Sequence, residues 1–314
     1  QFLSSDPPAA IGQGQIWYNS TTDTFKSSTI TSAWTSSTAF PGVRWNTSGT
    51  GIQTASLTFG GATGPGGPTF LNTTFEGDGS SWTASGAQPI SSINQLDTGT
   101  QTAALGGGGL NSSSVNTDVI TSYNGTAWSV ETSFPQALKG PGGAGTTTAA
   151  LCFGTDGPGP GGVLTKSYNG TAWATEGALS TGRANMASGS PSETTAFAVG
   201  SLSPDSGGGT SDLMEVYNGT AWAGGGALST GTMQNGGTGS SADAMSIGGN
   251  PIPSVGTTVE RYNGTAWAAS PSLGTGRKQF ASSSQGGTIG ASWVGGGAGI
   301  PGTTEIYTEA AAVK

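Results

Sequence analysis

The chain has 314 residues, of which 33% are hydrophobic and only 8% are charged, and its formal net charge is −8. This charge repels nucleic acid and anionic membranes, and the sequence has no run of about 18 apolar residues, so we expect neither nucleic-acid binding nor membrane insertion. The 58 glycines and 16 prolines approach a low-complexity composition, but aromatic residues recur at a regular spacing, which favours a folded repeat protein over disorder.

The N-terminal 30 residues differ from the rest of the chain. Residues 1–12 are polar and contain prolines, which predicts a flexible lead-in or one that a partner orders. Residues 14–26 place apolar residues on both sides of a polar turn and predict a separate hairpin. We therefore interpret residues 1–30 as a lead-in and hairpin, a candidate segment for attachment or oligomerisation.

A repeat of 45 to 49 residues begins after this hairpin. The sequence Tyr-Asn-Gly-Thr-Ala-Trp occurs four times without change, and two further tryptophans extend the series toward the N-terminus. Asn-Gly between apolar residues is typical of a two-residue type I′ hairpin turn, so each copy predicts a strand, a tight turn and a strand. The six repeated tryptophans are Trp34, Trp82, Trp128, Trp173, Trp222 and Trp267.

Each repeat predicts four short strands. In the unit 174–222 we expect strands near residues 183–188, 194–199, 213–217 and 220–223, separated by turn residues. The second of these recurs at 54–59, 102–105, 148–153, 242–247 and 289–294, and a glycine follows every copy. The third carries an aromatic residue at Phe75, Tyr123, Tyr168, Tyr217, Tyr262 and Tyr307. Four strands in about 46 residues is the pattern of a β-propeller blade.

Six such units predict a closed ring. The last unit supplies three strands and ends at residues 304–308, whereas residues 32–35 have the Ala-Trp of an outer strand without the preceding Tyr-Asn-Gly. Pairing of these two segments would complete the sixth blade and leave no open sheet edge. The sequence therefore predicts an all-β fold, a six-bladed β-propeller over residues 31–309 with four antiparallel strands per blade, followed by a tail at 310–314.

The repeat also resembles a known family. A glycine pair, as at residues 248–249, is followed by an aromatic residue such as Tyr262 and then by a tryptophan such as Trp267, and this order resembles the kelch repeat over about residues 32–308. Gly154 and Gly200 depart from the pattern because no second glycine follows them. The resemblance implies a kelch-like propeller.

The residues that most catalysis requires are scarce. The chain has no histidine and a single cysteine, Cys152, which removes the Ser-His-Asp triad, the commonest zinc ligand and the copper ligands of galactose-oxidase-like kelch propellers. Cys152 lies in an apolar, strand-like run, which predicts a buried and unreactive thiol. We expect no cofactor, no metal and no enzymatic activity, although 17 acidic residues leave open a facing pair of carboxylates of the glycosidase type.

Two sets of charged residues recur at equivalent places, one shortly before the third-strand aromatic residue and one near the start of the first strand. For the acidic set the sequence favours a solvated or ion-paired position over a ligand role. For the basic set it favours a structural contact with a neighbouring blade over substrate binding. The acidic set is Glu215, Glu260 and Glu305, and the basic set is Arg44, Arg183 and Arg277.

The connections between second and third strands vary in length and sequence. They span residues 62–69, 106–117, 155–162, 201–211, 250–256 and 297–303. Because they hold one position in each blade, we expect them on one side of the disc, where variable loops on a rigid scaffold form a binding surface. The alternative interpretation is that these loops only connect the strands and have no binding role. The candidate binding residues in these loops are Asp156, Pro158, Pro160, Asp205, Pro251 and Pro253.

The hairpin carries a second resemblance. Its sequence from Gly14 to Thr21, followed by Phe25 and Lys26, is similar to a segment of structural proteins of tailed bacteriophages, and together with the Asn-Gly-Thr-Ala-Trp repeats it resembles virion fibre proteins of marine phages. The resemblance implies a virion surface protein, a tail-fibre or adhesin propeller used in host attachment. Its partners would be other virion proteins and a host cell-surface glycan or protein, with a homo-oligomer left open. The alternatives are a structural decoration protein of capsid, neck or tail without receptor contact, and a kelch-type lectin.

Overall fold

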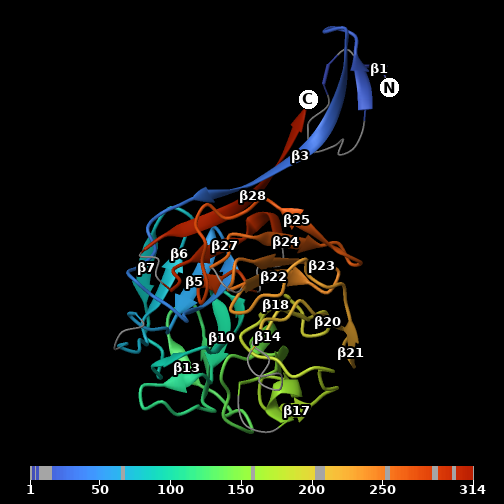
Figure 1. Ribbon diagram of the computed structural model, residues 1–314. Coiled ribbons are helices and arrows are strands. Elements are labelled where there is room, and N and C mark those ends of the chain that lie inside the picture. Colours follow the sequence, from blue (N-terminus) through green and yellow to red (C-terminus); the bar gives the residue numbers. More distant parts are fainter. Residues whose placement is uncertain are drawn as a thin grey trace.

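A computed structural model describes residues 2–3, 5–6, 16–64, 68–156, 160–201, 209–251, 255–284, 289–298 and 302–313. Six four-stranded antiparallel blades surround a common axis, and the inner strands of neighbouring blades contact one another around the full ring (Figure 1). The predicted all-β fold, a six-bladed propeller, is confirmed. In the described part of the chain no helix is long and apolar enough to cross a membrane.

The blades share one order of strands from the axis outward. The inner strands are β4 (Ser48–Ile52), β9 (Leu96–Thr100), β14 (Gly142–Gly145), β18 (Ala187–Gly189), β22 (Gly236–Ser240) and β26 (Ala281–Ser282). The second strands are β5 (Ala55–Phe59), β10 (Ala103–Gly107), β15 (Ala150–Phe153), β19 (Phe197–Val199), β23 (Asp243–Ile247) and β27 (Trp293–Gly295). The third strands are β6 (Thr74–Gly77), β12 (Ile120–Tyr123), β16 (Thr165–Tyr168), β20 (Met214–Tyr217), β24 (Val259–Tyr262) and β28 (Thr304–Val313). The outer strands are β7 (Trp82–Ser85), β13 (Trp128–Val130), β17 (Trp173–Thr175), β21 (Trp222–Gly224), β25 (Trp267–Ser270) and β3 (Thr24–Ser36). The short strands β8 (Ser92–Ile93) and β11 (Leu110–Asn111) pair beside the second blade.

The sixth blade is closed by the N-terminal part of the chain. Strand β3 pairs with β28 in antiparallel register, with Trp34 opposite Tyr307 and Thr35 opposite Ile306, which confirms the predicted closure. The pairing continues to Ser28 opposite Val313, so residues 310–313 belong to a strand and not to a separate tail. The predicted boundaries at residues 30 and 309 fall inside these two strands, because the β3–β28 ladder continues beyond the blade.

The continuation of β3 and β28 forms an arm that projects from the disc, and the labels of both chain ends stand beside this arm (Figure 1). Strand β2 (Ile16–Asn19) pairs with β3, which confirms the predicted hairpin, and β1 (Phe2–Leu3) lies parallel to β2. The Asp6 carboxylate accepts hydrogen bonds from the side chains of Trp17 and Asn19, at 3.1 and 2.7 Å. The arm therefore has its own small tip structure.

The four Asn-Gly turns differ from the predicted two-residue type I′ turn. Tyr123 pairs with Trp128, so the loop has four residues, and only its glycine has a positive φ. The side-chain oxygen of Asn124 accepts hydrogen bonds from the backbone N–H groups of Thr126 and Ala127, at 3.0 and 2.9 Å. The same bonds recur in the other three copies. Because the asparagine holds the turn through its side chain, it need not adopt the left-handed conformation.

Three further expectations require correction. In the first blade Gly77 pairs with Trp82 and therefore occupies the position that the repeated tyrosine has in the other blades. Phe75, which the sequence assigned to that position, lies two residues before it. In the sixth blade residues 289–291 form a 3-10 turn, η4 (Ile289–Ala291), so the second strand begins only at Trp293. The predicted first strand at 183–188 shrinks to β18, because Asn185 has a φ of 52° that interrupts an extended strand.

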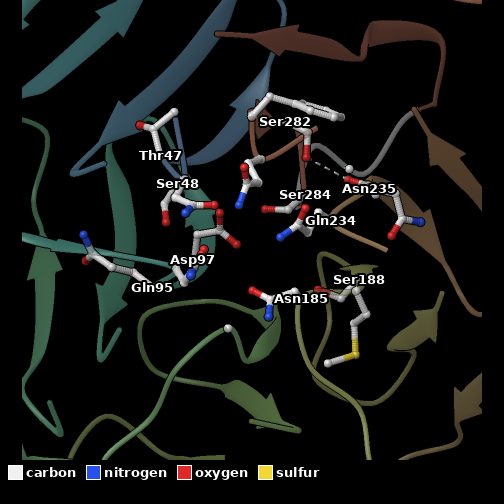
Figure 2. Close-up of a pocket in the computed structure, with 18 of the residues that line it drawn as sticks. Thr47, Ser48, Gln95, Asp97, Asn185, Ser188, Gln234, Asn235, Ser282 and Ser284 are labelled. Atoms are coloured by element: carbon white, nitrogen blue, oxygen red, sulfur yellow. Dashed lines mark hydrogen bonds between the residues drawn. The ribbon is translucent and has the colours of Figure 1, made fainter. Parts of the chain in front are cut away.

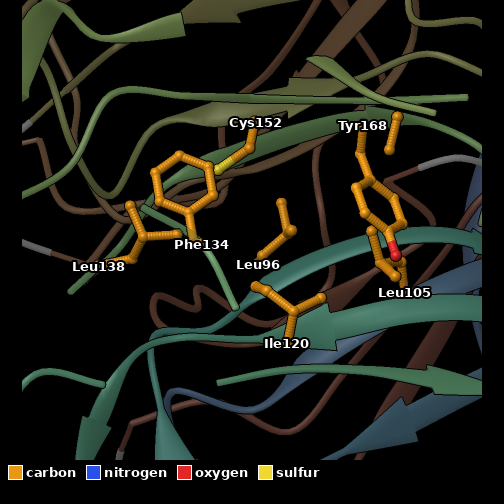
Figure 3. Packing of buried hydrophobic residues seen from close by; sticks show 8 residues of the cluster. Leu96, Leu105, Ile120, Phe134, Leu138, Cys152 and Tyr168 are labelled. Carbon is orange, nitrogen blue, oxygen red and sulfur yellow. The ribbon is translucent and has the colours of Figure 1, made fainter. Parts of the chain in front are cut away.

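The repeated aromatic residues form the core between blades. Trp128 packs against Tyr123 of its own blade and Phe59 of the preceding blade, with ring centroids 5.1 and 4.8 Å apart. Figure 3 shows the corresponding cluster between the second and third blades, which includes Leu96 and Cys152. Cys152 is fully buried as predicted, and burial raises the pKa of its thiol well above the usual range.

The recurring charged residues meet within one blade. Arg183 lies 2.8 Å from Glu215 in the fourth blade, and Arg277 lies 2.6 Å from Glu305 in the sixth, and all four side chains are buried. The predicted contact with a neighbouring blade is therefore wrong, because each arginine precedes the inner strand and reaches the third strand of the same sheet. In the first blade the guanidinium of Arg44 lies over the ring of Phe75, 4.7 Å from its centroid.

Candidate functional site

A closed ring of backbone hydrogen bonds surrounds the axis. One residue shortly before each inner strand has a left-handed φ, and its N–H donates to the carbonyl of the equivalent residue in the preceding blade, at 2.7 to 3.3 Å. These residues are Asn46, Asn94, Gly140, Asn185, Gln234 and Gln279. A left-handed conformation is unfavourable for residues with a side chain, least so for asparagine, so the ring bonds offset a local cost in the five blades that do not use glycine here.

The ring concentrates amide side chains. Five of its six residues are asparagine or glutamine, and in the described part of the chain their side-chain amides have no hydrogen-bond partner. Each amide offers both a donor and an acceptor. The chain therefore gathers five uncommitted amides from five blades at one point of the axis.

A second tier lies three residues further along each inner strand. It consists of Gly49, Asp97, Gly143, Ser188, Gly237 and Ser282. The glycines are required here because a Cβ at Gly143 would lie 2.5 Å from the carbonyl oxygen of Asp97, and one at Gly237 would lie 2.7 Å from the backbone N of Ser188. The inner strands thus approach closely at this level.

The six ring residues and four members of the second tier, Asp97, Ser188, Gly237 and Ser282, line a cavity of about 100 Å³ on the axis. Figure 2 shows Asp97, Asn185 and Gln234, from three different blades, directed toward the same opening. Asp97 is the only titratable residue among the described residues that line the cavity. We call this cavity, with its ring of amides, the axial mouth.

The Asp97 carboxylate has a perturbed acidity. Burial raises the pKa of Asp97 to about 7, and the hydrogen bond that its Oδ2 accepts from the N–H of Gly49, at 2.9 Å, lowers it only partly. No cation lines the cavity in the described part of the chain to balance the charge. Near neutral pH this group is therefore close to the midpoint of its titration.

The variable connections lie on the same side of the disc as the axial mouth. Their backbones hydrogen-bond to the segments that precede the inner strands. The N–H groups of Ser201, Asn250 and Asp156 donate to the carbonyl oxygens of Thr232, Met233 and Lys139, at 2.9, 2.8 and 2.7 Å. The Asn-Gly turns lie against the starts of the second strands, at the opposite end of the blades. We call the side with the variable connections and the axial mouth the loop face.

The structure places three of the six predicted binding residues. Asp156 forms a half-buried ion pair with Lys139, at 2.6 Å, Pro160 begins the 3-10 turn η2 (Pro160–Val163), and Pro251 lines a second cavity beside Leu228. Pro158, Asp205 and Pro253 lie outside the described residues.

Sequence reasoning missed the axial mouth. Asp97 has no acidic counterpart in the other blades, and the ring residues alternate between asparagine, glutamine and glycine, so neither set forms a conserved-looking motif within the chain. The available signal was an amide residue two positions before most inner strands.

No protein-family model matches this chain, and a search of curated proteins finds no relative.

Proposed function

We propose that the chain is a non-enzymatic virion surface protein, a phage tail-fibre or adhesin propeller that uses its loop face to bind a glycan or protein on the host surface. The observation that carries this proposal is the gathering of five uncommitted amides at the axial mouth. Amides pair with hydroxyl groups as donors and acceptors, which suits a sugar or a polar protein surface. The cavity presents one carboxylate, whereas glycoside hydrolysis by the usual mechanisms uses two.

A rigid disc supports this role. The six ring residues hold one another through backbone hydrogen bonds between neighbouring blades, so their backbones need little ordering when a ligand arrives. The described ends of the predicted binding loops lie on the same side of the disc as the mouth, and we expect the loops to extend the contact outward.

A structural decoration protein of capsid, neck or tail is the second candidate, and the arm favours it. Three large apolar residues on the arm are exposed: Phe25 at 76%, Ile16 at 68% and Ile30 at 42%. Exposed apolar side chains on a projecting ribbon suit attachment to other virion proteins or to a second copy of the chain. In the adhesin proposal the arm anchors the disc and the loop face contacts the host; in the decoration proposal the arm makes the only contact.

The test replaces ring amides without disturbing the ring. The double variant Asn185→Gly and Gln234→Gly copies the residue that the third blade already uses at Gly140, so the backbone hydrogen bonds should persist. We expect the labelled full chain to bind bacterial cells and a panel of their surface polysaccharides, and the double variant to lose at least about tenfold in affinity. Replacement of residues 155–162 and 201–211 by Gly-Ser linkers should also weaken binding.

The matched control carries Thr126→Ala and Thr171→Ala, two exposed positions in the turns at the other end of the blades. It should bind like the unmodified chain. Full binding by the ring variant and the loop variant together would exclude the loop face as the recognition surface, and absence of any binding by the unmodified chain would favour the decoration protein.

A further inference from the structure

The fifth blade contains a carboxylate without the arginine that accompanies it elsewhere. Glu260 holds the place of Glu215 and Glu305 and is 6% exposed, but Thr232 holds the place of Arg183 and Arg277. The second and third blades lack both members of the pair, with Ser92 and Leu138 at the arginine position and Thr121 and Lys166 at the glutamate position. Among the six blades, only the fifth keeps the glutamate alone.

The contacts of Arg183 define what this position accepts. Its guanidinium donates to the carbonyl oxygens of Thr181, Ala198 and Leu213, at 3.4, 3.4 and 2.9 Å, and to the carboxylate of Glu215 at 2.8 Å. Arg277 donates to the carbonyl oxygens of Thr303 and Gly296, at 3.3 and 3.1 Å, and to the carboxylate of Glu305 at 2.6 Å. The site is therefore a fixed fork of acceptors for a planar cation.

The fifth blade keeps this acceptor set around a cavity of about 70 Å³. The strand register makes Ser246 and Thr258 the counterparts of Ala198 and Leu213, and Thr230 the counterpart of Thr181. The lining residues are Leu228, Thr230, Thr232, Ser246, Gly248, Pro251, Thr258 and Glu260. Each residue that accepts a hydrogen bond from Arg183 therefore has a counterpart in the fifth blade. The cavity occupies the space beside Thr232 that an arginine side chain would fill at this position.

The polar groups that remain are only partly satisfied. The carboxylate of Glu260 accepts hydrogen bonds from the N–H and hydroxyl of Ser229, at 3.1 and 2.9 Å, as Glu215 does from Ser180. The buried hydroxyl of Thr232 has no hydrogen-bond partner. A buried carboxylate without a cation is costly, so a cation that fills the cavity would be held by charge as well as by shape. Thr230 and Thr258 are exposed, which places the cavity at the surface of the loop face.

We propose that this cavity is a binding site for a guanidinium group, supplied by a small guanidinium compound or by an arginine side chain of a partner protein. The site is independent of the axial mouth, because no described residue lines both cavities.

The experiment uses isothermal titration calorimetry to measure the binding of three compounds to the full chain: methylguanidinium, N-acetyl-arginine amide and N-acetyl-lysine amide. We expect methylguanidinium to bind with a Kd of about 1 mM. Binding of the arginine amide at similar or higher affinity identifies an arginine side chain as an acceptable source, whereas its exclusion restricts the site to small compounds. The lysine amide should bind at least about tenfold more weakly, because an ammonium cannot engage the planar fork.

Three variants locate the site. Thr232→Arg should fill the cavity with the side chain used in the fourth and sixth blades, raise the melting temperature and abolish methylguanidinium binding. Glu260→Gln retains the acceptor for Ser229 and should weaken binding at least about tenfold. The control Thr265→Arg adds the same charge at an exposed turn of the same blade, at its other end, and should leave binding unchanged. Absence of methylguanidinium binding by the unmodified chain, or binding of equal strength by Thr232→Arg or Glu260→Gln, would overturn the proposal.

Discussion

At the scale of single residues, the buried pair of Arg183 and Glu215 is the strongest local constraint. The arginine is 1% exposed and joins the segment before β18 to two neighbouring strands of its blade. Replacing it by methionine would keep most of its volume but leave the Glu215 carboxylate buried without a cation. We expect Arg183→Met to lower the free energy of unfolding by about 3–5 kcal/mol, measured by urea denaturation.

The control for this prediction is Lys166→Met, at a half-buried position where the ammonium donates to an exposed hydroxyl. It should change the free energy of unfolding by less than about 0.5 kcal/mol. Equal effects of the two substitutions would show that the Arg183 contacts do not govern stability.

At the scale of elements, the pairing of β3 with β28 decides whether the ring stays closed. Deletion of residues 1–36 removes β3 and exposes one whole edge of β28, an unpaired template for aggregation. We expect this variant to aggregate or to melt at a lower temperature, measured by light scattering and calorimetry. Deletion of residues 1–23 removes the hairpin partner but keeps β3 intact, and its propeller should melt like that of the unmodified chain. A monomeric 1–36 deletion with an unchanged melting temperature would refute the role of this closure.

At the scale of the whole molecule, titration of the Asp97 carboxylate in the axial mouth makes the free energy of unfolding depend on pH. The pKa of Asp97 rises from 3.8 to about 7 on burial, so between these values the folded chain holds a proton that the unfolded chain has released. Stability from this group is therefore greatest below about pH 4 and is lost as the pH rises to about 7. The chain has no histidine, so few other groups titrate in the same range.

We therefore expect the melting temperature of the unmodified chain to fall between about pH 5 and about pH 8, and Asp97→Asn to remove this fall. The substituted amide oxygen still accepts the hydrogen bond from the Gly49 N–H. Calorimetry across this range measures the difference between the two chains. Parallel profiles for both would show that Asp97 titrates at its ordinary pKa.

The sequence by itself determined the repeat, the number of blades, the four strands of each blade and the closure of the last blade by residues 32–35. These features follow from local signals, the alternation and turn chemistry that recur every 45 to 49 residues, so each copy supports the others. The same reasoning misplaced Phe75, because an aromatic residue can shift by two positions without leaving its face of the strand. It located the Asn-Gly turns correctly but predicted the wrong turn type, because an asparagine can hold a turn through its side chain.

Only the tertiary structure brings together the residues of the candidate site. The five ring amides and Asp97 come from separate blades and meet only when the ring closes, so no window of sequence contains the axial mouth. The pairing of Arg183 with Glu215 likewise depends on strand register. The same register places Thr232 of the fifth blade where the fourth and sixth blades have an arginine, so Glu260 has no arginine partner. The physical reason is the same in both cases. Local sequence determines the strands and turns of each repeat, whereas the axial mouth and the unpaired Glu260 arise from contacts between residues that are distant in sequence.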